Sequence, residues 1–184
     1  MRKKWIWRCE GSNMVDFEES GMRFRFAAEK TYYIEKSDVF DKKLNAVGAS
    51  SVECVTLHGD LVCFIEAKTS APNPATSMEN FSSYVAKIVK KFTDSLMICE
   101  AIHGNLWSEE GMGAELKERL YNAPKIHFIL IIQKHEKAWS SSLQDCLAKE
   151  MRSLLKIWKA SVIVLNKEQA LDYHLIVPDE NEIA

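Results

Sequence analysis

The sequence has few glycines and prolines, no long apolar run and little net charge. Its 7 glycines and 4 prolines are about half the usual share of these residues, and neither an interdomain linker nor a low-complexity tract is evident. The longest apolar stretch, residues 126–132, is far shorter than the 18 or more residues of a membrane-spanning helix. A secretory signal requires an apolar segment near the N-terminus. In this sequence Arg8 and Glu10 interrupt any such segment. We therefore expect a cytoplasmic protein that makes no membrane contact.

Local cysteine and histidine motifs for metals or disulfides are also lacking. The five cysteines are odd in number, widely spaced and form no CxxC pair, so we expect buried, reduced thiols. The histidines show neither HExxH nor HxxxH spacing. The net charge of −2 excludes a strong overall attraction to nucleic acid, so any such contact must be local.

The length and composition predict one globular domain over residues 1–184, since 47% of the residues are apolar and 27% charged. Strands are predicted at residues 22–26, 52–57, 61–66, 126–132 and 161–165. Apolar residues at three- and four-residue steps predict helices at residues 37–44, 76–102, 114–121, 143–158 and 167–173. This order predicts the α/β class, with a single mixed β-sheet flanked by helices and an α-β-α segment at the C-terminal end.

Charged residues stand beside the predicted hairpin of residues 52–66. If Gly59 and Asp60 form its two-residue turn, Glu53 faces Glu66 across the two strands. Two carboxylates at that spacing, about 4.5–5.5 Å between Cβ atoms, are unfavourable unless a proton or a cation lies between them. Lys68 shares a face with Glu66, because side chains in a strand alternate between faces. The pattern predicts a site for a hard divalent cation.

The chemistry that this arrangement favours is phosphodiester hydrolysis. Mg²⁺ binds one or two carboxylates together with water and a substrate phosphate, and Mn²⁺ can replace it. We expect Glu53 and Glu66 to hold the cation, which activates a water molecule and neutralises developing phosphate charge. Lys68 is expected to position the nucleophile or to stabilise the transition state.

Glu53, the hairpin, the tripeptide Glu66-Ala67-Lys68, a long helix and a further strand together resemble the PD-(D/E)xK superfamily of restriction-endonuclease-like nucleases. This chain would be an atypical member, since Glu53 and Val52 stand where the motif has aspartate and proline. The resemblance implies an αβββαβ core over about residues 31–133 and Mg²⁺-dependent cleavage of DNA or RNA. It also implies the backbone carbonyl of Ala67 as a metal ligand and Glu35 as a further acidic residue.

Other interpretations of the same residues remain open at this stage. Glu53, Glu66 and Lys68 could form an exposed ion network that contributes only a few tenths of a kcal/mol per pair. A nuclease-like fold with a degenerate site could instead act in protein binding or assembly, including self-association, and the net charge favours this alternative. Lys87, Lys90 and Lys91 on the long helix could contact phosphates or simply lie on a solvated helix face.

Overall fold

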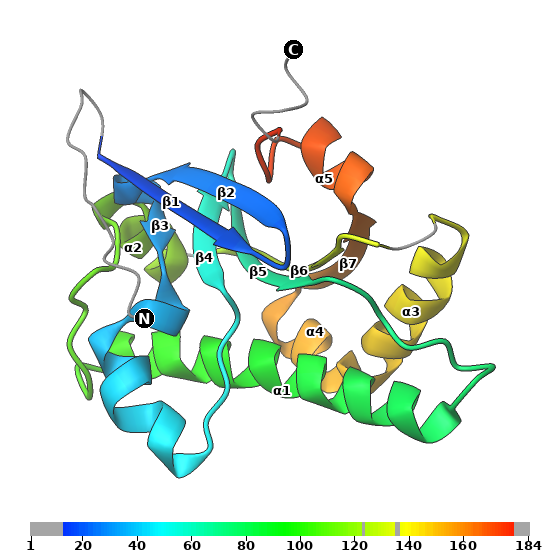
Figure 1. Ribbon diagram of the computed structural model, residues 1–184. Coiled ribbons are helices and arrows are strands. Elements are labelled where there is room, and N and C mark those ends of the chain that lie inside the picture. Colours follow the sequence, from blue (N-terminus) through cyan, green and yellow to red (C-terminus); the bar gives the residue numbers. More distant parts are fainter. Residues whose placement is uncertain (1–12, 123, 135–136, 179–184) are drawn as a thin grey trace.

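The computed structural model describes residues 13–122, 124–134 and 137–178, and it contains two β-sheets with helices around them (Figure 1). The chain N-terminal to residue 13, including Arg8, Cys9 and Glu10, lies outside the described residues. The strands are β1 (Met14–Glu19), β2 (Met22–Ala27), β3 (Thr31–Tyr32), β4 (Cys54–His58), β5 (Leu61–Lys68), β6 (Lys125–Ile132) and β7 (Ser161–Asn166). The α-helices are α1 (Met78–His103), α2 (Ala114–Tyr121), α3 (Lys137–Glu150), α4 (Arg152–Trp158) and α5 (Lys167–Asp172).

The larger sheet has the order β3-β4-β5-β6-β7. Strands β3, β4 and β5 are antiparallel neighbours, whereas β5, β6 and β7 run parallel. Helices α1 and α2 lie in the connection from β5 to β6, because parallel neighbours need a long crossover between them. The α/β class and the mixed sheet are therefore confirmed, and so is the C-terminal α-β-α segment, formed by α3 and α4, β7 and α5.

The prediction of a single sheet is wrong, because β1 and β2 form a separate antiparallel hairpin. Its two turn residues, Ser20 and Gly21, have φ angles of 53° and 70°, the positive values that a type I′ hairpin turn requires. Phe24 and Phe26 are buried on one face of β2, as predicted. The resemblance implied an αβββαβ core that begins with a helix at about residue 31. In the described structure, the short 3₁₀ and π-helical turns of residues 34–47 lie between β3 and β4 instead of before three strands.

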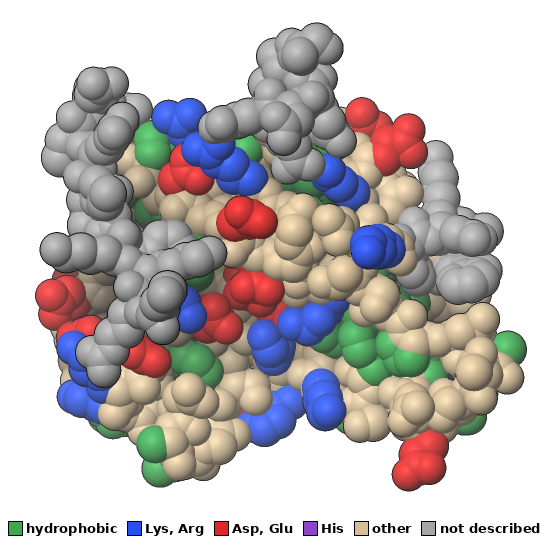
Figure 2. Space-filling model, in the orientation of Figure 1, with side chains coloured by type: hydrophobic (Ala, Val, Ile, Leu, Met, Phe, Trp, Pro, Cys, Tyr) green, Lys and Arg blue, Asp and Glu red, His purple; other side chains and the backbone are tan. Residues whose placement is uncertain are grey.

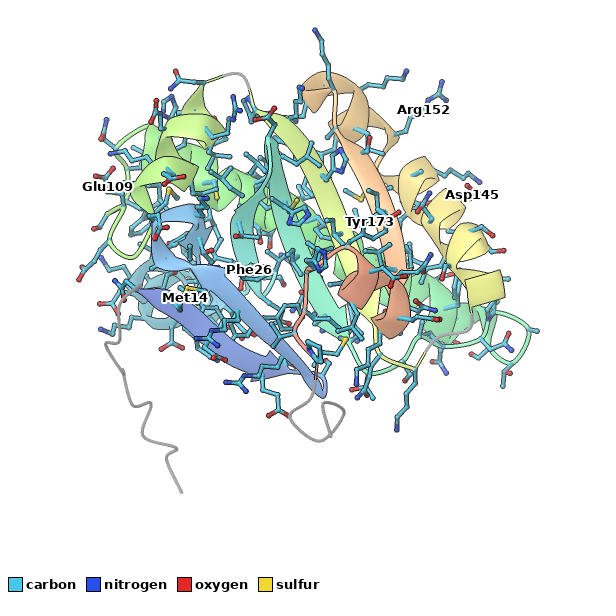
Figure 3. All side chains as sticks on the ribbon, turned by 90° about the horizontal axis from the view of Figure 1, so that it is seen from above. Met14, Phe26, Glu109, Asp145, Arg152 and Tyr173 are labelled. Atoms are coloured by element: carbon cyan, nitrogen blue, oxygen red, sulfur yellow. The ribbon has the colours of Figure 1, made fainter. Side chains whose placement is uncertain are left out.

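The large sheet separates two apolar clusters. On one face, Val55, Val62 and Phe64 pack with the buried stripe of α1 and with residues of α2 and α3. On the other face, Cys63 and Ile65 pack with the β1–β2 hairpin and α5. Figure 3 shows the hairpin, labelled at Met14 and Phe26, and α5, near Tyr173, on this second face. Both faces of β4 and β5 are therefore covered.

Helix α1 follows its prediction closely. The Ser77 side chain caps its N-terminus by accepting a hydrogen bond from the amide of Asn80. Other boundaries differ: α3 begins at Lys137 rather than near residue 143, and the predicted helix of residues 143–158 is divided at Met151. Residues 40–47 form π-helical and 3₁₀ turns in place of an α-helix. None of the helices in the described ranges is long and apolar enough to cross a bilayer.

The described cysteines form no disulfide, in agreement with the prediction of reduced thiols. Cys54, Cys63 and Cys99 are buried, and Cys146 is partly buried. Burial raises the pKa of the Cys63 thiol to about 12, because the thiolate would lose its hydration in the apolar layer. These side chains therefore act as small apolar residues of the core.

Candidate active site

Glu53 and Glu66 are buried at the end of the β4–β5 hairpin. The predicted register is confirmed through the pairs Val55–Phe64 and Cys54–Ile65. At Glu53 the ladder shifts, since its amide donates to the carbonyl of Ile65 at 3.0 Å. The residues Glu53 and Glu66 are 2% and 0% exposed. The alternative of an exposed ion network is therefore wrong, because such a network keeps its carboxylates in water.

Helix α1 fixes the backbone that leads into Glu53. The hydroxyl of Ser95 accepts a hydrogen bond from the amide of Val52 at 2.9 Å, and the Asp94 carboxylate accepts one from Ser50 at 2.8 Å. Ser95 is itself fully buried. Two side chains of one helix therefore hold this segment in place, and the position of Glu53 does not depend on the strand pairing alone.

Two lysines meet the Glu66 carboxylate. Lys68 forms an ion pair with Glu66 Oε1, and about a third of its side chain is exposed. Lys91, from helix α1, places Nζ 2.8 Å from Oε1 and 3.0 Å from Oε2 of Glu66. The same Nζ lies 3.8 Å from Oε1 of Glu53. The Lys91 ammonium therefore contacts both buried carboxylates and neutralises part of their charge.

Lys87, Lys90 and Lys91, the possible phosphate-contacting patch, do not all lie on the same face of α1. Lys91 turns inward, with a side chain that is 22% exposed. Lys90 pairs with Asp94 one turn further along the helix, and Lys87 is exposed. Only Lys87 and Lys90 therefore remain on the outer face of α1. Figure 2 shows lysine or arginine side chains beside acidic ones near the middle of the face that it draws.

Glu53 also belongs to a second group of carboxylates. One carboxylate oxygen each of Glu19, Glu35 and Glu53 lies within 4.8 Å of the other two. Glu19 is the last residue of β1, and Glu35 lies in a 3₁₀ turn at Ile34–Lys36. The amide of Glu35 donates to the carbonyl of Glu53 at 3.4 Å, which holds this turn beside the end of β4.

Ala67 contacts the turn of the β1–β2 hairpin. Its backbone carbonyl, the expected metal ligand, accepts a hydrogen bond from the Ser20 hydroxyl at 3.2 Å. The side chain of Gln133, which follows β6, donates to the carbonyl of Gly21 at 3.0 Å. These two contacts attach the hairpin turn to the ends of β5 and β6, so Glu19 is carried to the same end of the sheet as Glu66.

The electrostatics of the site favour a bound proton or cation. The pKa of Glu53 is raised to about 9, first by burial and then by the carboxylates of Glu66 and Glu35, while Lys91 lowers it. Burial also raises the pKa of Glu66, against the opposing effects of Lys91 and Lys68. Oε2 of Glu53 is buried and has no hydrogen-bond partner among the described residues. A hard cation would satisfy this oxygen, because carboxylate oxygens are its preferred ligands.

Tyr33 and Tyr84 border the site and were not predicted from the sequence. The pKa of Tyr84 on α1 is raised by burial and then by the Glu66 carboxylate, and its hydroxyl has no hydrogen-bond partner within the described ranges. The pKa of Tyr33 is raised by burial and then by Glu35 and Glu53. Both phenols therefore stay protonated and can donate a hydrogen bond.

A second Glu-x-Lys tripeptide, Glu115-Leu116-Lys117, lies on helix α2, where its acid and base cannot act together. Leu116 is fully buried, whereas Glu115 pairs with Lys30 and Lys117 with Glu109. Residues two positions apart on a helix do not face each other. The strand context therefore distinguishes Glu66-Ala67-Lys68 from this copy.

Comparison of the chain with protein-family models, curated proteins and solved structures gives no match. Its class therefore rests on its own architecture, which is α/β with a five-stranded mixed sheet and a separate two-stranded hairpin.

Proposed function

We propose that this protein is a Mg²⁺- or Mn²⁺-dependent nuclease of the PD-(D/E)xK type, which hydrolyses phosphodiester bonds of DNA or RNA. The observation that carries the proposal is the buried pair of Glu53 and Glu66, with Lys68 beside it at the edge of solvent. The order of β3, β4, β5, α1 and β6 supports it, because the resemblance implies three strands, a helix and a strand after its first helix; here α2 is an addition between α1 and β6.

The residues fit a divalent cation by their chemistry. Carboxylates of Glu53, Glu66 and Glu35 are hard oxygen donors, and Oε2 of Glu53 is buried without a partner among the described residues. The carbonyl of Ala67 was predicted to join them, although it accepts a hydrogen bond from Ser20. When bound, such a cation lowers the pKa of a water ligand and offsets negative charge on the phosphate.

The protein groups have separate roles in this proposal. Lys91 favours the ionised form of Glu66 and orients its carboxylate by contacting both of its oxygens. Lys68 is partly exposed, so its ammonium can reach a phosphate and stabilise the charge that develops during hydrolysis. Lys87 and Lys90 lie on the outer face of the same helix, where they can contact phosphates of a bound strand.

One observation favours a second candidate function, a nuclease-like module with a degenerate site that acts in protein binding or assembly. The Lys91 ammonium already contacts Glu66 and lies 3.8 Å from Glu53. A lysine in this position can stabilise the buried acids without any metal ion. In that case we expect association with a protein partner or a second copy that EDTA does not abolish.

Activity against single-stranded and duplex DNA and RNA, with Mg²⁺ or Mn²⁺, tests the first proposal. We expect cleavage by the wild type and a loss of at least ~100-fold in Lys68→Ala, the size typical for removal of a transition-state donor. Lys117→Ala is the matched control, because it changes the lysine of the second tripeptide on α2, and it should retain activity. Circular dichroism checks the folding of each variant.

Equal cleavage by the wild type and Lys68→Ala, or cleavage that persists in EDTA, would contradict the nuclease proposal. Absence of cleavage together with metal-independent association would support the assembly module instead. Sedimentation velocity with and without EDTA measures that association.

A further inference from the structure

The β1–β2 hairpin brings a carboxylate to the site that the sequence did not indicate. Glu19 ends β1, and the type I′ turn that follows it is attached to the main sheet through Ser20 and Gly21. Glu18, the preceding residue, points to the opposite face of the hairpin and is exposed, as alternation along a strand requires. Glu19 is partly buried and reaches Glu35 and Glu53.

We infer that the divalent cation binds on the hairpin side of Glu53, between the carboxylates of Glu19, Glu35 and Glu53, rather than between Glu53 and Glu66. The catalytic role of this cation rests on the proposed function, but its binding can be measured without catalysis. The ligand class is a hard divalent cation such as Mg²⁺ or Mn²⁺, because the three donors are all carboxylate oxygens.

The two candidate positions for the cation differ in the protein groups that already fill them. Between Glu53 and Glu66 the Lys91 ammonium is 2.8 Å and 3.0 Å from the two oxygens of Glu66. The Ala67 carbonyl, a third predicted ligand, accepts a hydrogen bond from Ser20. A cation there would have to displace a lysine and a hydroxyl. On the hairpin side, one carboxylate oxygen from each of three residues already converges.

Glu53 has one carboxyl oxygen without a hydrogen-bond partner among the described residues. Its side chain is 2% exposed, Oε1 is the atom facing Lys91 at 3.8 Å, and Oε2 is without a hydrogen-bond partner in the described chain. Leaving a buried carboxyl oxygen without a partner is unfavourable, because the hydration that it loses on folding is not replaced. A cation shared with Glu19 and Glu35 removes that cost and also the repulsion among the three carboxylates.

The three carboxylate oxygens need to move only slightly closer together to bind a cation. Oxygen ligands about 2.1 Å from Mg²⁺ lie at most about 4.2 Å apart on opposite sides of the ion. The three oxygens lie within 4.8 Å of one another, so side-chain rotation of the partly buried Glu19 and Glu35 is sufficient. Glu35 also pairs with the exposed Lys36 at 3.4 Å. Glu19 accepts a hydrogen bond from the amide of Ser20 at 2.9 Å, and the Ser20 hydroxyl oxygen lies 3.1 Å from the same carboxylate oxygen. These exposed or partly exposed contacts can rearrange around an ion.

Calorimetric titration of Mn²⁺ into the full chain, without nucleic acid, tests this position. We expect saturable binding by the wild type and a loss of affinity of at least ~10-fold in Glu19→Gln and in Glu35→Gln, since each removes a charged ligand. Glu18→Gln is the matched control on the other face of the hairpin and should bind as the wild type does. Glu66→Gln is the discriminating variant, and its affinity should fall less than that of Glu19→Gln or Glu35→Gln. Thermal melts of each variant without Mn²⁺ report its folding.

The alternatives give distinct results. Loss of binding in Glu66→Gln with normal binding in Glu19→Gln would overturn this inference and place the cation between Glu53 and Glu66. No Mn²⁺ binding by the folded wild type at millimolar concentration would also overturn it. Binding that depends on Glu19 in a protein without nuclease activity would support the cation position while contradicting the proposed function.

Discussion

Replacing Lys91 by methionine is expected to lower the free energy of unfolding by about 3–5 kcal/mol at neutral pH, the cost of breaking a buried ion pair by removing one partner. Methionine keeps most of the packing volume on α1 but removes the charge. Glu66, which is fully buried, would keep only Lys68 as a charged partner, and Glu53 would lose the cation nearest to it. Urea unfolding followed by circular dichroism measures the change.

Two further variants make this result specific to the buried charges. Lys87→Met changes an exposed lysine on the same helix and should alter the free energy by no more than about 0.5 kcal/mol. The double variant Lys91→Met with Glu66→Gln should recover a large part of the loss, because the orphaned charge is removed as well. A decrease no larger than that of Lys87→Met would show that the carboxylates do not depend on the Lys91 ammonium.

Replacing Glu53 by glutamine is expected to change the pH dependence of stability in metal-free protein, measured in EDTA. The folded-state pKa of Glu53 is raised from 4.5 to about 9 by burial and neighbouring carboxylates. Between these values the folded state retains a proton that the unfolded state has lost, so stability falls as pH rises. The wild type should therefore lose stability relative to Glu53→Gln by up to about 1.4 kcal/mol per pH unit in this window.

Urea midpoints from about pH 5 to about pH 8 measure the difference, which should be small near the lower limit and grow toward the upper one. Glu118→Gln, an exposed substitution on α2, serves as the control and should run parallel to the wild type. Parallel curves for the wild type and Glu53→Gln would show that Glu53 has a similar pKa in the folded and unfolded states.

Local signals in the sequence were sufficient for the large sheet and for α1. The Gly59-Asp60 turn fixed the register of β4 and β5, because a two-residue loop leaves only one pairing of the flanking residues. Periodic apolar residues and the cap at Ser77 located α1. These features depend on residues close together in the chain, which is why they could be predicted.

Features that depend on distant contacts were missed. Strand β1 buries Phe17 but otherwise consists of partly buried and exposed residues, so its hydrophobic pattern is weak. The proximity of Glu19 to Glu53 follows only from packing of the hairpin on the sheet.

The inward position of Lys91 did have a usable signal in the sequence. It lies three residues after Ile88 and four before Ser95, both buried, and this spacing places it on the inner face of the helix.

The order of the charged residues along the chain has a consequence for folding. Glu53 and Glu66 belong to one hairpin, whereas Lys91 follows Glu66 by 25 residues and the contact of Ser20 with Ala67 spans 47. Local hairpins close before longer loops, whose closure costs more entropy. At neutral pH the two acids therefore approach each other before the lysine arrives, and we expect completion of the hairpin to await docking of α1. Acidification removes that repulsion, so the hairpin should then form independently of the helix.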